Sequence, residues 1–165
     1  MSLSLLKNLF AYKAWANQEL LQQLASVDPS HSEPLHNSLR LLNHTYVVDS
    51  LFKAHLTQTA APFTATNTKT TPSLAELQQA MQETDAWFIA YLNTLSETDL
   101  AYQLEFSFTD GDRGRMSREE ILHHLIAHGA YHRGNVGQNL RLIGLAPPRD
   151  LFTRFLHQAE PERRN

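Results

Sequence analysis

Three histidines spaced four residues apart are the residues of this sequence whose type and spacing best suit the binding of a metal ion. They are His124, His128 and His132. Successive residues of an α-helix are rotated by about 100°, so residues four apart lie on nearly the same face, one turn apart. Two imidazoles placed in this way on an inward face can bind one metal ion. A lone inward histidine is more often a hydrogen-bonded core residue, so the spacing alone leaves both interpretations open.

The residues around these histidines predict one helix with both ends marked. Ser117 and Glu120 have the spacing of a capping box, in which each side chain accepts a hydrogen bond from a free backbone N–H group. Gly144 can adopt the left-handed conformation that ends a helix, and Pro147 and Pro148 follow it. The sequence therefore predicts a helix over residues 117–144.

The apolar face of this helix indicates which histidines point inward. It is formed by Ile121, Leu122, Leu125, Val136 and Leu140. Measured from the middle of this face, His132 lies about 30° away, His128 about 70° and His124 about 110°. His128 and His132 are therefore expected to point inward, and His124 is expected at the rim.

Two common histidine metal sites are excluded by the neighbouring residues. Gly129 follows His128 where an H-E-x-x-H metalloprotease has its glutamate, so no general base stands beside the metal on this helix. A ferritin-like di-iron site needs inward Glu-x-x-His segments. Of the two such segments, the one at Glu33 begins a helix and the one at Glu120 faces outward. We therefore expect neither a metalloprotease nor a di-iron protein.

The composition narrows the function further. The chain has 165 residues, of which 42% are hydrophobic, and this suits a single domain over residues 1–165. A formal net charge of −3 argues against nucleic acid as a partner. The absence of cysteine excludes disulfides, a thiolate nucleophile and cysteine-type zinc sites. We see no signal peptide and no apolar run of transmembrane length, so we expect no membrane partner and a cytoplasmic location.

The remaining chain predicts an all-α fold, a four-helix bundle with a short extended or hairpin insertion before the last long helix. Helical spacing of apolar residues marks three further long helices. Alternating residues after the third helix indicate a strand followed by a turn. The expected elements are helices over residues 3–25, 34–56 and 73–95, a crossover loop over 57–72, a strand over 102–108, a turn over 109–114 and a short final turn over 150–156.

The second predicted helix supplies one more histidine to the core. His44 shares a face with Leu41, Val48 and Leu51 and is therefore expected to point inward. His55 lies three turns further on, roughly 16 Å away along the axis, too far to share an ion with His44. Asp49 lies on another face, where we expect solvation or a structural ion pair.

Three stretches of the chain resemble the DinB/YfiT-like metalloenzyme superfamily. They are F-A-Y-K-A-W-A-N from residue 10, L-N-H-T-Y-V-V-D from residue 42 and H-G-A-Y-H-R-G-N-V-G-Q-N-L-R-L-I-G-L-A-P-P-R-D from residue 128. They occur in the expected order and span nearly the whole chain. The Y-H-R-G element and the following G-x-x-P-P-x-D are the most specific parts. The resemblance implies a four-helix bundle, commonly a homodimer, whose three metal ligands map to His44, His128 and His132.

The resemblance also implies a range of reactions. Relatives include transferases that use bacillithiol or mycothiol and a mycothiol-dependent isomerase, while other members have no assigned reaction. We expect a metal-dependent transferase or hydrolase that acts on a small molecule. It is expected to bind one divalent ion, with nickel or zinc as the first choice and iron or manganese as alternatives. His124 and Tyr131 are the candidate catalytic residues, and Arg133 is a candidate for the dimer or for a substrate anion. The alternative is a stress-response or binding protein whose metal is structural.

Overall fold

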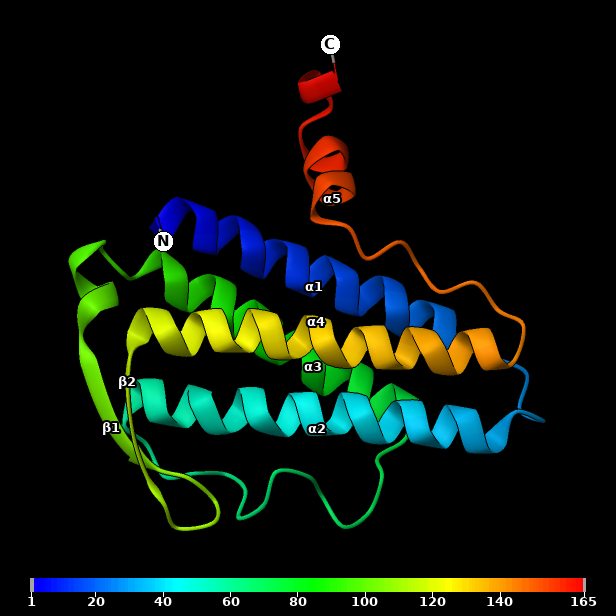
Figure 1. Ribbon diagram of the computed structural model, residues 1–165, viewed down its shortest axis with the longest axis horizontal. Helices are drawn as coiled ribbons and strands as arrows, with labels where there is room; N and C mark the ends of the chain where they lie inside the picture. Colours follow the sequence, from blue (N-terminus) through cyan, green and yellow to red (C-terminus); the bar gives the residue numbers. More distant parts are fainter. Residues whose placement is uncertain (1, 165) are drawn as a thin grey trace.

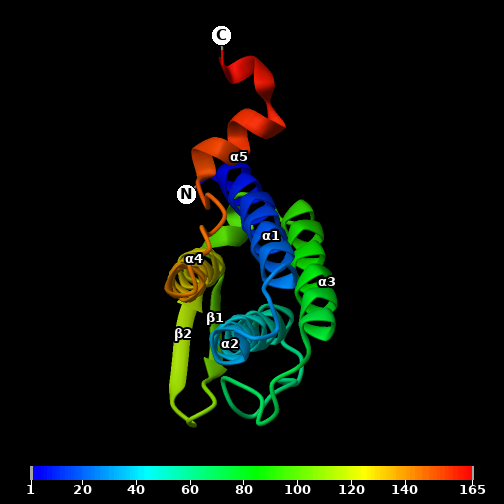
Figure 2. The same ribbon diagram turned by 90° about the vertical axis from the view of Figure 1, so that its right-hand side faces the viewer.

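The computed structural model describes residues 2–164, and helices dominate it (Figures 1 and 2). Its long helices match the predicted ones within a few residues. The long helices are α1 (Leu3–Ala25), α2 (Ser32–Thr57), α3 (Leu74–Asn93) and α4 (Arg118–Leu142). The short elements are the 3₁₀ helix η1 (Thr98–Ala101), strands β1 (Gln103–Ser107) and β2 (Arg113–Ser117), helix α5 (Phe152–Ala159) and the 3₁₀ helix η2 (Pro161–Arg164). No helix in the described part of the chain is long and apolar enough to cross a membrane.

Each long helix packs against two others. α2 contacts α4 and α3, while α1 contacts α3 and α4, so the four helices surround a common core (Figure 2). α2 and α4 lie side by side and run in opposite directions (Figure 1). This antiparallel pairing brings the middle of α2 close to the middle of α4, which is where the candidate ligands lie.

The core consists of two apolar clusters with polar residues between them. One cluster, at the end of the molecule next to the strands, includes Leu6, Phe10, Phe52, Phe88 and Leu125. The other, towards the opposite end, includes Leu20, Leu42, Met81, Val136 and Leu140. Along every long helix, the residues between the two groups include buried polar side chains. The apolar clusters provide the burial that stabilises the fold, and the polar layer lies at the level of the histidines.

The start of α4 has the predicted capping box. The Glu120 N–H donates to Ser117 Oγ at 3.2 Å, and the Ser117 N–H donates to Glu120 Oε2 at 2.6 Å. A second predicted box, formed by Ser73 and Glu76, begins α3. After the last residue of α4, Gly144 has a positive φ of 78°, as a residue that ends a helix often does. Both ends of α4 are therefore fixed by local sequence.

The predicted extended segment is an antiparallel hairpin. β1 pairs with β2 in a register that places Phe106 opposite Gly114. A Cβ atom at Gly114 would lie 2.6 Å from the ring of Phe106 and 2.8 Å from that of Phe108, so the glycine leaves room for both rings. Ser117 is both the last residue of β2 and the N-cap of α4. The hairpin thus leads directly into the helix that carries the histidines.

The C-terminal segment lies on the outside of the long helices. Residues 144–151 run back along α4, and α5 then projects away from the body (Figure 1). α5 has no buried residue, and it contacts the rings of Tyr12 and Trp15 on α1 through Phe152, Phe155 and Arg154. The short final turn expected at residues 150–156 is therefore a helix displaced by a few residues.

Candidate metal centre

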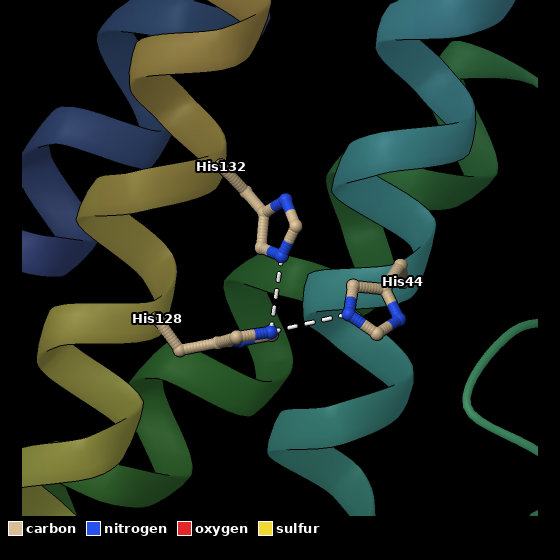
Figure 3. Close-up of side chains that lie close together, drawn as sticks. All are labelled: His44, His128 and His132. Carbon is tan, nitrogen blue, oxygen red and sulfur yellow. Dashed lines mark hydrogen bonds between the residues drawn. The ribbon is translucent and has the colours of Figure 1, made fainter.

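The structure brings the three expected ligands together between α2 and α4. His44 Nε2 lies 3.1 Å from His128 Nε2, which lies 3.1 Å from His132 Nε2 (Figure 3). One nitrogen from each ring lies within 4.8 Å of the other two. His128 and His132 are one turn apart on α4, and His44 faces them from α2. Neutral imidazole nitrogens arranged in this way are ligands that a divalent transition metal accepts.

The crossover loop holds the ring of His44 in place. His44 Nδ1 lies 2.7 Å from the carbonyl oxygen of Thr66. Because a carbonyl only accepts hydrogen bonds, Nδ1 is the protonated nitrogen and Nε2 presents its lone pair to the other two rings. The loop itself is tied to α2, since Asn43 Nδ2 donates to Asn67 Oδ1 at 2.5 Å and to Thr68 Oγ1 at 2.6 Å. The contact between His44 Nδ1 and the Thr66 carbonyl is of the kind that orients the ring of a histidine able to bind a metal ion.

Burial favours the neutral form of His128 and His132. Burial, together with the positive charges that His132 and His44 would carry, lowers the pKa of His128 to about 3. Burial is also the main cause that lowers the pKa of His132. At neutral pH these rings therefore keep a lone pair for a metal ion and need lose no proton before binding it.

Hydrogen bonding alone does not satisfy this cluster. In the neutral tautomer that donates from Nδ1 to Thr66, His44 Nε2 carries no proton, so a hydrogen bond between His44 and His128 requires a proton on His128 Nε2. The same proton cannot also point well at His132 Nε2, which lies at the same distance of 3.1 Å. If His132 donates instead, two lone pairs face each other across the His44–His128 contact. A cation among the three nitrogens removes this conflict, so the donor set fits a metal ion.

The group offers three protein ligands and no carboxylate. His44, His128 and His132 are its only members among the described residues. A catalytic zinc site has three protein ligands and an open position, whereas a structural one is closed by a fourth. Three protein ligands are the number found in an open site. Nδ1 of His128 and Nδ1 of His132 are buried and have no hydrogen-bond partner among the described residues.

The other candidate residues lie around this group. The ring of His124 stacks on that of His128, with centroids 5.3 Å apart, and it also packs against Phe52. Tyr131 is 68% exposed, and its ring centroid lies 5.1 Å from that of His132. His55 stacks on Phe106 of the hairpin. The rings of His124 and Tyr131 border the three histidines, but none of these side chains is part of the group whose nitrogens converge.

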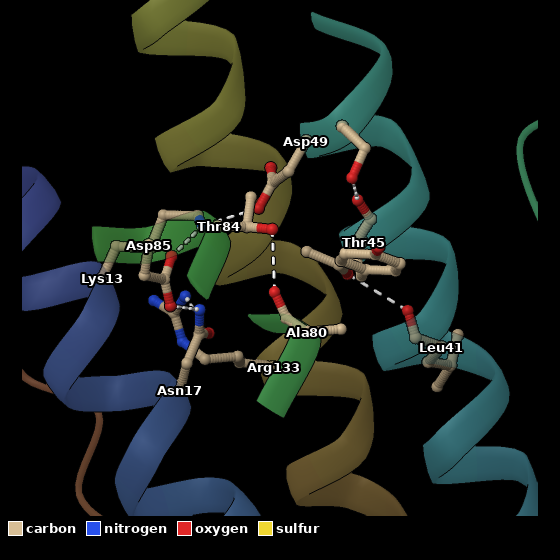
Figure 4. Close-up of polar contacts among 11 residues, drawn as sticks. Lys13, Asn17, Leu41, Thr45, Asp49, Ala80, Thr84, Asp85 and Arg133 are labelled. Atoms are coloured by element: carbon tan, nitrogen blue, oxygen red, sulfur yellow. Dashed lines mark hydrogen bonds and ion pairs between the residues drawn. The ribbon is translucent and has the colours of Figure 1, made fainter. Parts of the chain in front are cut away.

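A buried ionic network behind the histidines was not predicted. Lys13 is fully buried, and its Nζ lies 2.7 Å from Asp49 Oδ2 and 2.8 Å from Asp85 Oδ1 (Figure 4). Asn17 Nδ2 donates to Asp85 Oδ2 at 2.8 Å, and Arg133 Nη1 donates to Asn17 Oδ1 at 3.3 Å. Each of the four long helices contributes at least one of these residues. The network therefore links all four helices at one level of the core.

Two charged residues with expected roles belong to this network. Asp49 is a buried ion-pair residue, which is one of the two roles expected for it. Arg133, a candidate for the dimer or for a substrate anion, has a partner within its own chain. Its side chain is buried, and Nε lies 2.7 Å from Asp150 Oδ2. The helix turns Arg133 inward because it lies four residues after Gly129 and three before Val136, both of which are buried.

The network lies directly against the histidine helix. A Cβ atom at Gly129, next to His128, would lie 3.2 Å from Arg133 Nη1 and 3.4 Å from Lys13 Cε. The missing side chain at Gly129 therefore lets Lys13 of α1 approach α4 and leaves room for the guanidinium group of Arg133. The charge of Lys13 also contributes to lowering the pKa of His128. Gly129 stands where a metalloprotease would have its glutamate, and in this structure it leaves room for the side chains of Lys13 and Arg133.

The fold and the site together define a mostly helical protein with three histidines that could bind a metal ion. The model of the DinB family matches residues 1–164, and the chain belongs to that family. It is 23% identical over 173 residues to protein DinB of Bacillus subtilis (strain 168), an alignment that covers 94% of this chain and 95% of the relative. The family resemblance found in the sequence is therefore confirmed.

Proposed function

We propose that this protein is a metal-dependent enzyme, a DinB/YfiT-like four-helix bundle whose single domain spans residues 1–165. His44, His128 and His132 would bind one divalent ion, nickel or zinc in the first place. The observation that carries the proposal is the convergence of three Nε2 atoms that hydrogen bonds among the rings cannot satisfy. Membership of the DinB family supports it.

The donor set decides the chemistry we propose. When bound, a divalent ion with an open position would supply a Lewis acid that ionises a water or thiol near neutral pH. The chain contains no cysteine, so a thiol nucleophile has to be a small-molecule cosubstrate. We therefore propose S-transfer from a low-molecular-weight thiol of the bacillithiol or mycothiol type to an electrophile, as in detoxification, or hydrolysis. Such thiols are kept reduced in the cytoplasm, where we place the protein.

His124 and Tyr131 are the side chains we propose for proton transfer. His124 is half-buried, and burial lowers its pKa, so the ring is neutral at pH 7 and can accept a proton. Tyr131 is exposed and can donate a hydrogen bond to a substrate beside His132. Substitution of either residue is expected to lower kcat while the bound metal remains.

The test is a thiol-transfer assay with defined metal content. The protein is stripped with chelator, reloaded with nickel or zinc, and mixed with bacillithiol, mycothiol or glutathione and chlorodinitrobenzene. A parallel arm measures hydrolysis of p-nitrophenyl acetate. We expect at least one reaction to accelerate with bound metal and to lose the acceleration in His128→Ala. The exposed Arg113→Gln variant is the control. If metal loading raises the melting temperature but accelerates no reaction in either arm, the enzyme assignment is wrong. The alternative, a binding protein with a structural metal, then replaces it.

We further propose that two chains associate as a homodimer. The family resemblance supports this association, and Leu142 on α4, which is 73% exposed, is a large apolar side chain that a partner chain would remove from water. Light scattering should give about twice the 18.8 kDa of one chain at micromolar concentrations. A mass equal to that of one chain throughout this range would contradict the dimer.

A further inference from the structure

A cavity of about 860 Å³ lies between α4 and the segment that follows it. One wall is the exposed side of α4, and the other is the returning segment 144–151, which Figure 1 shows running back beside α4. A Cβ atom at Gly137 would lie 3.3 Å from Pro147, so the glycine allows the segment to approach the helix closely. The volume is within the range of small-molecule sites. None of the three convergent histidines lines this cavity.

The cavity has an excess of positive charge. Three arginines line it, Arg133, Arg141 and Arg149, and Asp150 is the single acidic residue among the lining residues. Asp150 is already engaged, because Arg133 Nε lies 2.7 Å from its Oδ2 and the Tyr12 hydroxyl donates to its Oδ1. Asp150 and Arg133 therefore neutralise each other, and Arg141 and Arg149 supply the excess.

Arg141 and Arg149 have no partner of their own. Both are exposed, and within residues 2–164 their guanidinium groups make no hydrogen bond or ion pair. A guanidinium group presents a planar set of donors that matches a carboxylate or phosphate. Two such groups line one cavity whose single acidic residue, Asp150, is already paired with Arg133, and an anionic ligand would complete this arrangement.

The rest of the lining is apolar. Leu145, Pro147, Pro148 and Leu151 come from the returning segment, and Ala130 comes from α4. An inorganic ion would contact the arginines and leave these side chains without a partner. A ligand with an apolar body beside its anionic group would contact both kinds of surface.

We propose that this cavity binds a small organic anion, whose carboxylate or phosphate group contacts Arg141 and Arg149 and whose apolar body lies against Leu145, Pro147 and Leu151. The inference goes beyond the proposed function, because it uses neither a metal nor the histidines. Binding should therefore be the same in metal-free and metal-loaded protein.

Isothermal titration of the full chain in low salt tests the proposal. The probes are 2-naphthoate and 2-naphthyl phosphate, which share an apolar body, with 2-naphthalenemethanol as the neutral match and acetate and inorganic phosphate as anions without that body. We expect one or both naphthyl anions to bind at least tenfold more tightly than the alcohol and the bare anions. Arg141→Gln and Arg149→Gln should each weaken binding roughly fivefold, and the double variant more. Arg113→Gln, an exposed arginine of the hairpin, should leave binding unchanged.

Three results would overturn the proposal. The first is equal affinity for the naphthyl anions and the neutral alcohol, which would show that the arginines do not select charge. The second is equal affinity for bare phosphate and naphthyl phosphate, which would make the site one for inorganic anions. The third is unchanged binding in the Arg141→Gln, Arg149→Gln double variant, with melting curves confirming that it is folded.

Discussion

Replacing Lys13 by methionine tests whether the buried ionic network stabilises the fold. Methionine fills a similar volume but removes the charge. Asp49 then loses its hydrogen-bond partner, and Asp85 keeps only Asn17. Burial lowers the pKa of Lys13, but the two carboxylates outweigh it and raise the pKa to about 12, which indicates that the charged lysine is stabilised where it lies.

The expected cost follows from the burial of these groups. Lys13 is fully buried, Asp49 is 2% exposed and Asp85 is 5% exposed. Removing one partner of a buried ion pair costs about 3–5 kcal/mol because a charge is left buried without compensation. In a chain of this length, each kcal/mol lowers the melting temperature by about 2–4 °C. Lys13→Met should therefore lower the melting temperature by roughly 10 °C.

The same variant should acquire a characteristic pH dependence. Burial raises the pKa of Asp49 from 3.8 to about 6, and without Lys13 the pKa should rise further. When folding raises the pKa of an acid, the protonated acid contributes to the stability of the fold. This contribution is fully present at a pH below the pKa of the unfolded state, and it is lost as the pH rises through the pKa of the folded state. Lys13→Met should therefore be less destabilised at pH 5 than at pH 8.

Thermal and urea unfolding of metal-free protein at both pH values measures this effect. Lys7→Met, at a half-buried position of the same helix, is the matched control and should change the free energy of unfolding by under about 0.5 kcal/mol. Adding Asp49→Asn to Lys13→Met should recover part of the loss, because the buried charge is removed. A loss below about 1 kcal/mol at pH 8 for Lys13→Met would refute the reasoning.

Three further outcomes are expected from the local structure. Ser117→Ala removes the side-chain cap of α4 and should cost about 1 kcal/mol in urea unfolding, whereas Ser4→Ala, at an exposed position of α1, should cost far less. Gly134→Ala adds a methyl group with no atom within 4 Å and should stabilise the helix by up to about 1 kcal/mol. Gly129→Val places its branch against Lys13 and Arg133 and should destabilise the fold by about 2 kcal/mol, so a stable Gly129→Val variant would contradict the packing described for α4.

The helices were predictable because their signals are local. Helical spacing of apolar residues, two capping boxes and Gly144 determine where the long helices begin and end, and each signal acts within a few residues. The inward direction of His128 and His132 followed from the apolar face of α4. The structure also places His44 opposite them, a relation that the sequence could suggest only through the family resemblance.

The ionic network was missed because buried lysine is rare, so Lys13 was not considered for the core. A signal was nevertheless present. The apolar positions of α1 alternate in steps of three and four residues, and the same stripe includes Lys13 and Asn17. Its members are Leu3, Leu6, Phe10, Lys13, Asn17, Leu20 and Leu24. A polar residue inside such a stripe predicts a buried partner, as polar residues in helix–helix interfaces do.

The contact between His44 and the crossover loop could not be predicted in this way. Thr66 lies 22 residues from His44, and its carbonyl oxygen is a backbone group that no residue type marks. The displacement of α5 has a similar cause. The short helix makes its apolar contacts with rings of α1, far away in sequence, so its bounds depend on tertiary packing rather than on local signals.

The metal content of five single variants tests the central claim most directly. Each purified variant is loaded with nickel or zinc, dialysed, and analysed by mass spectrometry for metal per chain. The wild type, His124→Ala and His55→Ala should each bind one ion, while His44→Ala, His128→Ala and His132→Ala should lose it, because two ligands leave an incomplete shell. If His124→Ala loses its metal while His44→Ala keeps one ion, the site lies along α4 alone and the proposed metal centre is wrong.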